Sequence, residues 1–449
     1  MRFRVLAAGL TAGMVALAAP AAEAFCGFYV GKADSSLFNE ASQVVMVRDG
    51  ERTVLTMSND YKGELTDFAL VVPVPVVLKR EQLHVGERKY VERLDAYSAP
   101  RLVEYFDEDP CAVPEVMLEM AAPMAGAPSA APRDELRRKN LGVTVEAEYT
   151  IGEYDIVLLS AKESTGLETW LRESGYKIPP RAAKALEPYI KQDMKFFVAK
   201  VNLKEHKAKG FNYLRPLQMA YESKKFMLPI RLGMANAKGP QDLVIYAMTR
   251  QGRVESSNYR TVKIPSDMDI PVFVKNEFKQ FYPALFEKAH AREEKRAIFT
   301  EYVWDMGWCD PCAADPLSPE ELRALGVFWL DGQNANRGGG SQVVLTRLHA
   351  RYDGEHFPED LVFQETSDRQ NFQARYVLRH AFKGPLTCDA GKEYLATLEK
   401  RHQQEAETLA KLTGWELGTI TKKMGDDAPG KKKAGSGKPP EPWYKRLWR

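Results

Sequence analysis

The chain has almost no excess of charge of either sign. Of its 449 residues, 63 are lysine or arginine and 61 are aspartate or glutamate, which leaves a formal net charge of +2. A nucleic-acid-binding chain normally carries a clear basic excess, so no nucleic-acid partner is expected. A disordered or fibrous chain is also excluded, because 44% of the residues are hydrophobic and 10% are aromatic.

Recognisable catalytic motifs are missing as well. The sequence contains no Gly-x-Ser-x-Gly elbow and no His-Glu-x-x-His pair. The run Gly338–Gly340 lacks the Lys-Ser/Thr ending of a phosphate-binding loop and leads into a predicted strand. We therefore expect no cofactor and no metal, and the sequence leaves open whether the protein is an enzyme.

Long apolar runs are confined to the first residues. Arg2 and Arg4 precede the charge-free stretch from Val5 to Ala19, and Ala22–Ala24 reads as an A-x-A cleavage site. The stretch is shorter than the ~20 residues that a membrane-spanning helix needs. Residues 1–24 therefore predict a signal peptide, with export to the periplasm or the cell exterior.

The mature chain begins with a β-rich pattern. Ser42 to Val47 and Arg52 to Met57 flank an Asp-Gly pair, which predicts a β-hairpin. Phe68 to Leu78 reads as a further strand, and Pro73 and Pro75 limit it to a sheet edge or a strand end. We predict an N-terminal β-rich region over residues 25–120, antiparallel and sandwich-like.

The remainder mixes strands and helices. We expect helices from about Lys275 to Thr300, from a capping box at Ser318 to near Gly326, and from Glu393 to Leu412. Strands and helices do not alternate regularly, so the fold class is α+β. We predict a linker or long loop at 121–140, a mixed α+β region at 141–425 and a disordered tail at 426–449.

Several short sequence segments along the mature chain resemble those of an exported bacterial family catalogued as domain of unknown function 2330. They are Phe25 to Val30, Ala41 to Val45 with Asp49-Gly50, Phe68 to Pro75, Ala99 to Tyr105, Ile151 to Asp155 and Leu167 to Leu171. The resemblance implies secretion. It implies no activity and no catalytic residue.

The five cysteines can form disulfides if the protein is exported to an oxidising compartment. Cys26, Cys111, Cys309, Cys312 and Cys388 form two disulfides and leave one thiol in our preferred interpretation, and we expect the bridges to staple distant parts of the chain. Two pairs among five cysteines allow 15 connectivities, so the sequence does not choose between them.

Two other uses of the cysteines remain open. Cys309-Asp310-Pro311-Cys312 follows Trp308 and resembles a thioredoxin-type redox motif, with Cys309 as nucleophile and Cys312 as resolving thiol. Against this, the nearest helix signal comes six residues later, and Asp310 opposes thiolate formation. Alternatively, Cys309, Cys312 and Cys388 could bind zinc with His380.

The last residues have a composition of their own. Residues 426–449 contain seven lysines and arginines against three acidic residues. Their end, Trp443-Tyr444-Lys445-Arg446-Leu447-Trp448-Arg449, interleaves aromatic and cationic side chains, which suits an anionic membrane surface. The alternative is a solvated tail.

Taken together, the sequence predicts an exported protein with a non-enzymatic binding or envelope-associated role. The chain has core, cap and turn signals but no complete catalytic set. A thiol-disulfide oxidoreductase that uses Cys309 and Cys312 is the competing hypothesis.

Overall fold

The computed structural model describes ten stretches of the chain. They are residues 28–31, 42–59, 68–112, 143–162, 164–176, 182–208, 213–236, 239–310, 315–330 and 342–430. The predicted signal peptide, the predicted linker and residues 431–449 of the predicted tail lie outside them. In these stretches no helix is both long and apolar enough to cross a bilayer.

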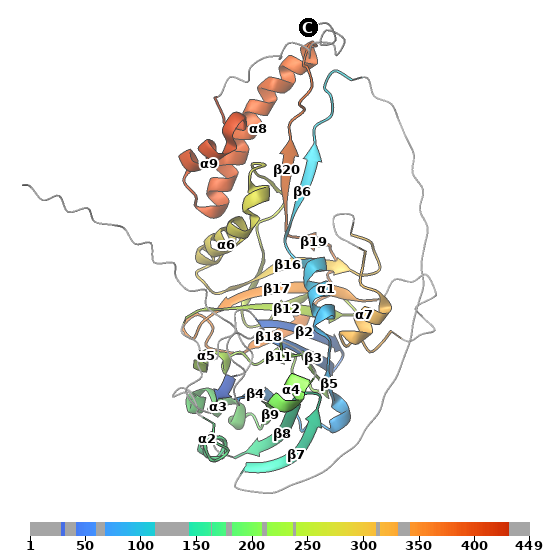
Figure 1. Cartoon of the computed structure of the whole chain (residues 1–449), viewed down its shortest axis with the longest axis vertical. Coiled ribbons are helices and arrows are strands. Elements are labelled where there is room, and N and C mark those ends of the chain that lie inside the picture. Colours follow the sequence, from blue (N-terminus) through green and yellow to red (C-terminus); the bar gives the residue numbers. More distant parts are fainter. Residues whose placement is uncertain are drawn as a thin grey trace, which may run out of the picture.

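A nine-stranded mixed sheet crosses the middle of the described structure (Figure 1). In order across the sheet, its strands are β14 (Arg260–Lys263), β16 (Ala297–Asp305), β17 (Val344–Tyr352), β12 (Gln241–Thr249), β2 (Ser42–Asp49), β3 (Arg52–Asn59), β10 (Leu217–Glu222) and β5 (Leu83–Val85), and β19 (Phe372–Gln373) pairs with β16. The predicted hairpin is confirmed as β2 and β3, which pair antiparallel from Ser42 opposite Asn59 to Asp49 opposite Arg52. Gly50 takes the positive φ that this tight turn requires.

A second sheet packs face to face against the first. Its strands are β1 (Phe28–Gly31), β4 (Phe68–Val74), β9 (Lys195–Val201), β8 (Tyr154–Ala161) and β7 (Val143–Ile151), antiparallel throughout. Alternate residues such as Val44 and Met46 of β2, and Leu70 and Val72 of β4, meet in one buried cluster. This β-sandwich is the largest core of the described chain.

Helices cover the outer faces of the two sheets. Those on the described structure are α1 (Arg88–Ser98), α2 (Ser164–Glu173), α3 (Ala182–Lys191), α4 (Leu203–Ala208), α5 (Gly233–Asn236), α6 (Val274–Arg292), α7 (Pro319–Ala324), α8 (Asp389–Thr413) and α9 (Leu417–Met424), with the 3₁₀ turns η1 (Arg80–Gln82) and η2 (Gly425–Asp427). Helices α2 and α3 pack on the five-stranded sheet. On the nine-stranded sheet, α1 and α7 cover one half and α6 covers the other. Helix α8 packs on α6, and α9 packs on α8 (Figure 1).

Two small sheets complete the described structure. One joins β11 (Met227–Leu228), β18 (Leu361–Glu365) and β13 (Val254–Ser256), and the other joins β15 (Met268–Asp269), β20 (Arg375–His380) and β6 (Arg101–Phe106). Figure 1 shows β6 and β20 rising from the body as a narrow ribbon beside α8. The predicted α+β class, with a sandwich-like β-rich part, is thus confirmed.

The two regions expected on either side of residue 121 contribute to the same sheets. Strand β2 pairs parallel with β12, and β3 pairs antiparallel with β10. Strand β4 likewise pairs with β9. Strands β2 and β12 are about 200 residues apart in the chain, and local sequence carries no signal for such a pairing. The region boundaries at residues 120 and 141 are drawn from composition alone, and they stay predictions.

The helix expected from Lys275 to Thr300 is wrong at its C-terminal end. Helix α6 ends at Arg292, and residues 297–305 form strand β16. Glu294 and Lys295 between them adopt positive φ values of 54° and 59°, which turns the chain back onto the sheet. Burial of Ile298 and Phe299 between long-range neighbours overrides the helical periodicity.

One disulfide is present among the described cysteines. Cys111 and Cys388 are bonded across 277 residues, with their Cα atoms 6.0 Å apart. Cys111 lies in a turn in which its backbone N–H donates to Asp109, and Cys388 is the N-cap of α8, where its sulfur accepts from Gly391 N–H at 3.2 Å. The bond therefore fastens the far end of the β6–β20 ribbon to the start of α8, as the expectation of a staple between distant segments requires.

Removing this staple should destabilise the protein. We expect the double variant Cys111→Ala/Cys388→Ala to lose about 2–4 kcal/mol of unfolding free energy, because the reduced chain regains the conformational freedom of a long closed loop. Denaturant unfolding under oxidising conditions measures the change. Cys309→Ala is the matched control, since Cys309 is free and exposed; equal stability of the two variants would contradict the prediction.

Candidate functional site

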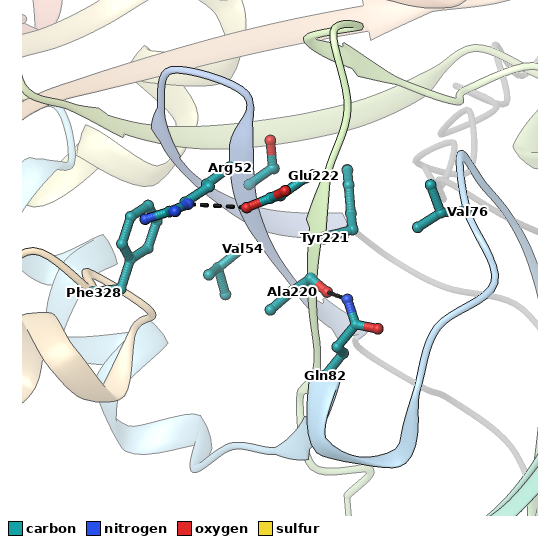
Figure 2. Close-up of a pocket in the computed structure, with 9 residues that line it drawn as sticks. Arg52, Val54, Val76, Gln82, Ala220, Tyr221, Glu222 and Phe328 are labelled. Atoms are coloured by element: carbon teal, nitrogen blue, oxygen red, sulfur yellow. Dashed lines mark hydrogen bonds and ion pairs between the residues drawn. The ribbon is translucent and has the colours of Figure 1, made fainter.

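An open pocket lies at the edge of the nine-stranded sheet, beside the part of β10 that extends beyond β5 (Figure 2). Strand β5 pairs only with Leu217 to Met219 of β10, whereas β10 continues along β3 to Glu222. Gln82 in η1 covers the next position, because its side-chain amide donates to the Ala220 carbonyl at 2.8 Å. The end of β10 beyond this contact forms one wall of the pocket.

A loop after α7 supplies the opposite wall. The predicted capping box is confirmed at the start of α7, where Ser318 and Glu321 exchange hydrogen bonds. The helix ends at Ala324, and Gly326 follows with a φ of 104°. A Cβ at Gly326 would stand 2.6 Å from the Val54 side chain, so only glycine lets this loop approach β3 and bring Phe328 over the pocket.

The lining is largely apolar, with one ion pair. Its members are Arg52, Thr53, Val54, Val76, Gln82, Ala220, Tyr221, Glu222 and Phe328. Arg52 donates to Glu222 at 3.0 Å, and their side chains are 68% and 70% exposed. A pair this exposed contributes little to stability, so both charges are available to a ligand.

The side chains that line the pocket are suited to binding a ligand. Burial raises the pKa of Tyr221 to about 12 despite the nearby Arg48 cation, so its hydroxyl keeps its proton at neutral pH. The described lining contains no cysteine, serine or histidine. A concave apolar surface with a few charged groups is typical of ligand sites.

The most concentrated group of charges lies elsewhere, on the helix-covered face of the same sheet. This charged row consists of Asp95 of α1, Asp242 of β12, Glu301 of β16, and Arg347 and His349 of β17. Strand alternation points Arg347 and His349 to the same face, and Glu301 stands at a β-bulge between Thr300 and Tyr302.

Short contacts connect the row. Arg347 donates to Glu301 and to Asp95, each at 2.6 Å. His349 lies between two carboxylates, with Nδ1 2.7 Å from Glu301 and Nε2 3.3 Å from Asp242. Glu301 also accepts from Tyr282 of α6, so the row ties α1 and α6 to the sheet.

The electrostatics of the row leave no free base. Burial alone would lower the pKa of His349, but Glu301 and Asp242 outweigh it and raise that pKa to about 9. Burial would raise the pKa of Glu301, but His349 and Arg347 hold it at about 2. At neutral pH His349 is therefore protonated and cannot accept a proton, which makes the row a structural element of the fold.

A second buried acid lies on α8. Burial raises the pKa of Glu405 to about 8, although Arg401 opposes the shift. Arg401 is committed to Asp107 at the end of the ribbon, with contacts of 2.7 and 3.1 Å. No group of three or more metal-ligating side chains occurs in the part of the chain that the structure describes.

The cysteines of the predicted redox motif are only partly described. Cys309 is free and exposed and follows Trp308, which is 69% exposed. Asp310 is buried instead of lying between two sulfurs in solvent, and it accepts from Tyr302 and Gln373. The next described helix, α7, begins only at Pro319, so no helix in the described residues places its N-terminus at Cys309, where it would stabilise a thiolate.

The other candidate residues divide as follows. Cys111 and Cys388 come together in the disulfide, which removes Cys388 from the predicted zinc set, and His380 instead contacts Glu104. Cys26, Cys312 and the membrane-surface candidates Trp443, Tyr444, Lys445, Arg446, Trp448 and Arg449 lie outside the described residues. Their roles stay predictions.

Sequence reasoning missed the pocket and the charged row. The only local signal for the row was Arg347, His349 and Arg351 at alternate positions of a strand that otherwise reads as apolar. Glu301 directly follows the helix expected to end near Thr300, and it lies in strand β16 instead. Asp95 lies in α1, a helix that the sequence pattern did not predict. Phe328 and Glu222 both line the pocket, but no short sequence pattern predicts that they lie close together.

With the geometry established, comparison with known proteins identifies the family. A family model described as "Uncharacterized protein conserved in bacteria" (DUF2330) matches residues 20–364. The chain belongs to this family. The resemblance noted in the sequence is thereby confirmed, and it assigns no activity to the DUF2330 protein.

Other comparisons add no function. No curated protein matches the chain. Among solved structures, the crystal structure of baculovirus P35 matches with 10% identity and a TM-score of 0.25, covering 50% of this chain and 68% of that one. A TM-score of this size supports no statement about fold or function.

The charged row should make the stability of this DUF2330 protein depend on pH. The folded-state pKa of His349, about 9, exceeds its ordinary value of 6.5. Its stabilising contribution is therefore complete below pH 6.5 and is lost as the pH rises through about 9.

We expect the wild type to lose of the order of 2 kcal/mol across this window relative to His349→Gln, which has no titrating group there. Urea unfolding at a series of pH values measures the difference. His356→Gln, at a half-buried histidine paired only with Asp353 of its own turn, is the control. Parallel pH profiles of wild type and His349→Gln would contradict the assignment.

The pocket should bind an amphipathic anion. We expect anilinonaphthalene sulfonate to pack its rings on Phe328 and Val54 and to place its sulfonate near Arg52. Phe328→Ala should weaken this binding about fivefold, since it removes apolar contact. Val362→Ala is the matched control, because Val362 and Phe328 are both 38% exposed; fluorescence titrations that do not distinguish the two variants would refute the site.

Proposed function

We propose that this DUF2330 protein is exported and serves as a non-enzymatic binding protein of the bacterial envelope. One observation carries the export step, namely the Cys111–Cys388 disulfide. Disulfides form and persist in the periplasm and outside the cell and are rare in the cytosol. The pattern of residues 1–24 supports the same route.

The binding role is supported by how the described polar groups are used. Charged side chains of the row are neutralised by one another, and His349 holds its proton between two carboxylates. The pocket, by contrast, has solvated charges and apolar walls but no nucleophile paired with a base. This combination favours recognition of a ligand over its chemical conversion.

Export can be tested on the intact chain. Expressed in a bacterial host, the full sequence should give a mature protein that begins at Phe25 in the periplasm or medium, with Cys111 and Cys388 resistant to a thiol reagent before reduction. The same chain without residues 1–24 should stay in the cytoplasm with both thiols reactive. Cell fractionation, N-terminal mass analysis and thiol labelling provide the readouts.

Two outcomes would change the proposal. Retention of the full-length chain in the cytoplasm, with both thiols reactive, would remove export. A labile Cys309–Cys312 bond in non-reducing peptide maps would instead favour the thiol-disulfide oxidoreductase, because a bridge that forms and opens readily is the signature of a catalytic pair.

A further inference from the structure

Among the described strands, β6 has one unpaired edge. It is the last strand in the order β15-β20-β6, and no described strand pairs with its outer side. Its second half is exposed, with Tyr105 at 44% and Phe106 at 71%. Natural edge strands are usually protected by lysine, proline or a covering segment, and β6 contains neither residue.

The direction of the backbone groups along β6 follows from its hydrogen bonds to β20. Arg101 N–H donates to Ala374 at 3.0 Å, and Asp107 N–H donates to His380 at 2.9 Å. Because backbone groups alternate along a strand, the odd-numbered residues face β20. Leu102, Glu104 and Phe106 therefore direct three N–H and three C=O groups outward.

We propose that these outward groups pair with those of a second copy of the chain, so that two β6 strands join antiparallel around a twofold axis at Glu104. In this register Leu102 faces Phe106 of the other copy, and Glu104 faces its own counterpart. Two hydrogen bonds for each of the three facing pairs satisfy all the outward groups. Registers centred on Val103 or Tyr105 bring only two facing pairs together.

Side chains in this register are also complementary. Val103 lies opposite Tyr105, and Leu102 lies opposite Phe106, which are favourable cross-strand combinations of apolar and aromatic groups. The oppositely charged Arg101 and Asp107 mark the two ends. The meeting of two Glu104 carboxylates is moderated because each is held by Lys275 at 2.7 Å and by His380 at 2.8 Å.

The ribbon is also rigid before it pairs. Phe106 stacks on His380 with ring centres 4.4 Å apart, and the Arg379 guanidinium lies over Tyr105 at 5.2 Å. The Cys111–Cys388 bond fastens the chain beyond both strands. A preorganised edge loses less conformational entropy when it associates.

The oligomeric state of the mature, oxidised chain tests the proposal. Sedimentation equilibrium over micromolar to submillimolar concentrations should show a monomer–dimer equilibrium. Phe106→Glu should raise the dissociation constant at least tenfold, because it sets a charge opposite Leu102 and beside the two Glu104 carboxylates. Met268→Glu is the matched control, since Met268 is exposed on β15 at the opposite edge of the same sheet.

A second pair of variants separates the backbone of residue 104 from its side chain. Glu104→Pro and Glu104→Ala both lose the carboxylate that contacts Lys275 and His380, but only Glu104→Pro also removes one outward N–H per copy, while it spares the ladder to β20. Glu104→Pro should therefore bind its copy at least tenfold more weakly than Glu104→Ala. In the wild type, amide exchange at residues 102, 104 and 106 should slow as the protein concentration rises. A wild type that stays monomeric, or a dimer that survives both Phe106→Glu and Glu104→Pro, would overturn the proposal, and neither result bears on export or on the pocket.

Discussion

The described fold depends on one buried carboxylate. Glu301 is 1% exposed and accepts hydrogen bonds from Arg347 and His349 of β17 and from Tyr282 of α6. The Arg347 and His349 cations would be expensive to bury without it, since an unpaired charge in the interior costs several kcal/mol, and the Tyr282 hydroxyl would lose its acceptor. The bulge that turns Glu301 toward them is therefore as important to the sheet as its apolar positions.

This arrangement divides the helix-covered face of the sheet. Apolar side chains under α1 and α7 form one cluster, and those under α6, α8 and α9 form another. The charged row crosses the sheet between them, and Phe286 of α6 stacks on His349 at 3.9 Å between ring centres. The opposite face packs on the five-stranded sheet through the largest apolar cluster of the described residues.

Buried and exposed charges of the molecule differ in their surroundings. The interior charges of the row neutralise one another, whereas the pair Arg52 and Glu222 is exposed to solvent beside the pocket. The β6–β20 ribbon contributes Tyr376 and Leu378 to the cluster packed on α6, and the covalent staple fastens its exposed far end. This far end has little apolar burial, so a crosslink there adds order that packing does not supply.

The sequence by itself determined the α+β class, the β2–β3 hairpin, the capped start of α7 and the membership of the DUF2330 family. These are local features: a turn, a cap or a phrase of residues is complete within about ten positions. Only the tertiary structure decided which cysteines pair, where α6 ends, and that Asp95, Asp242, Glu301, Arg347 and His349 meet. Those contacts join residues tens to hundreds of positions apart, and the burial that favours them exists only after the sheet has formed.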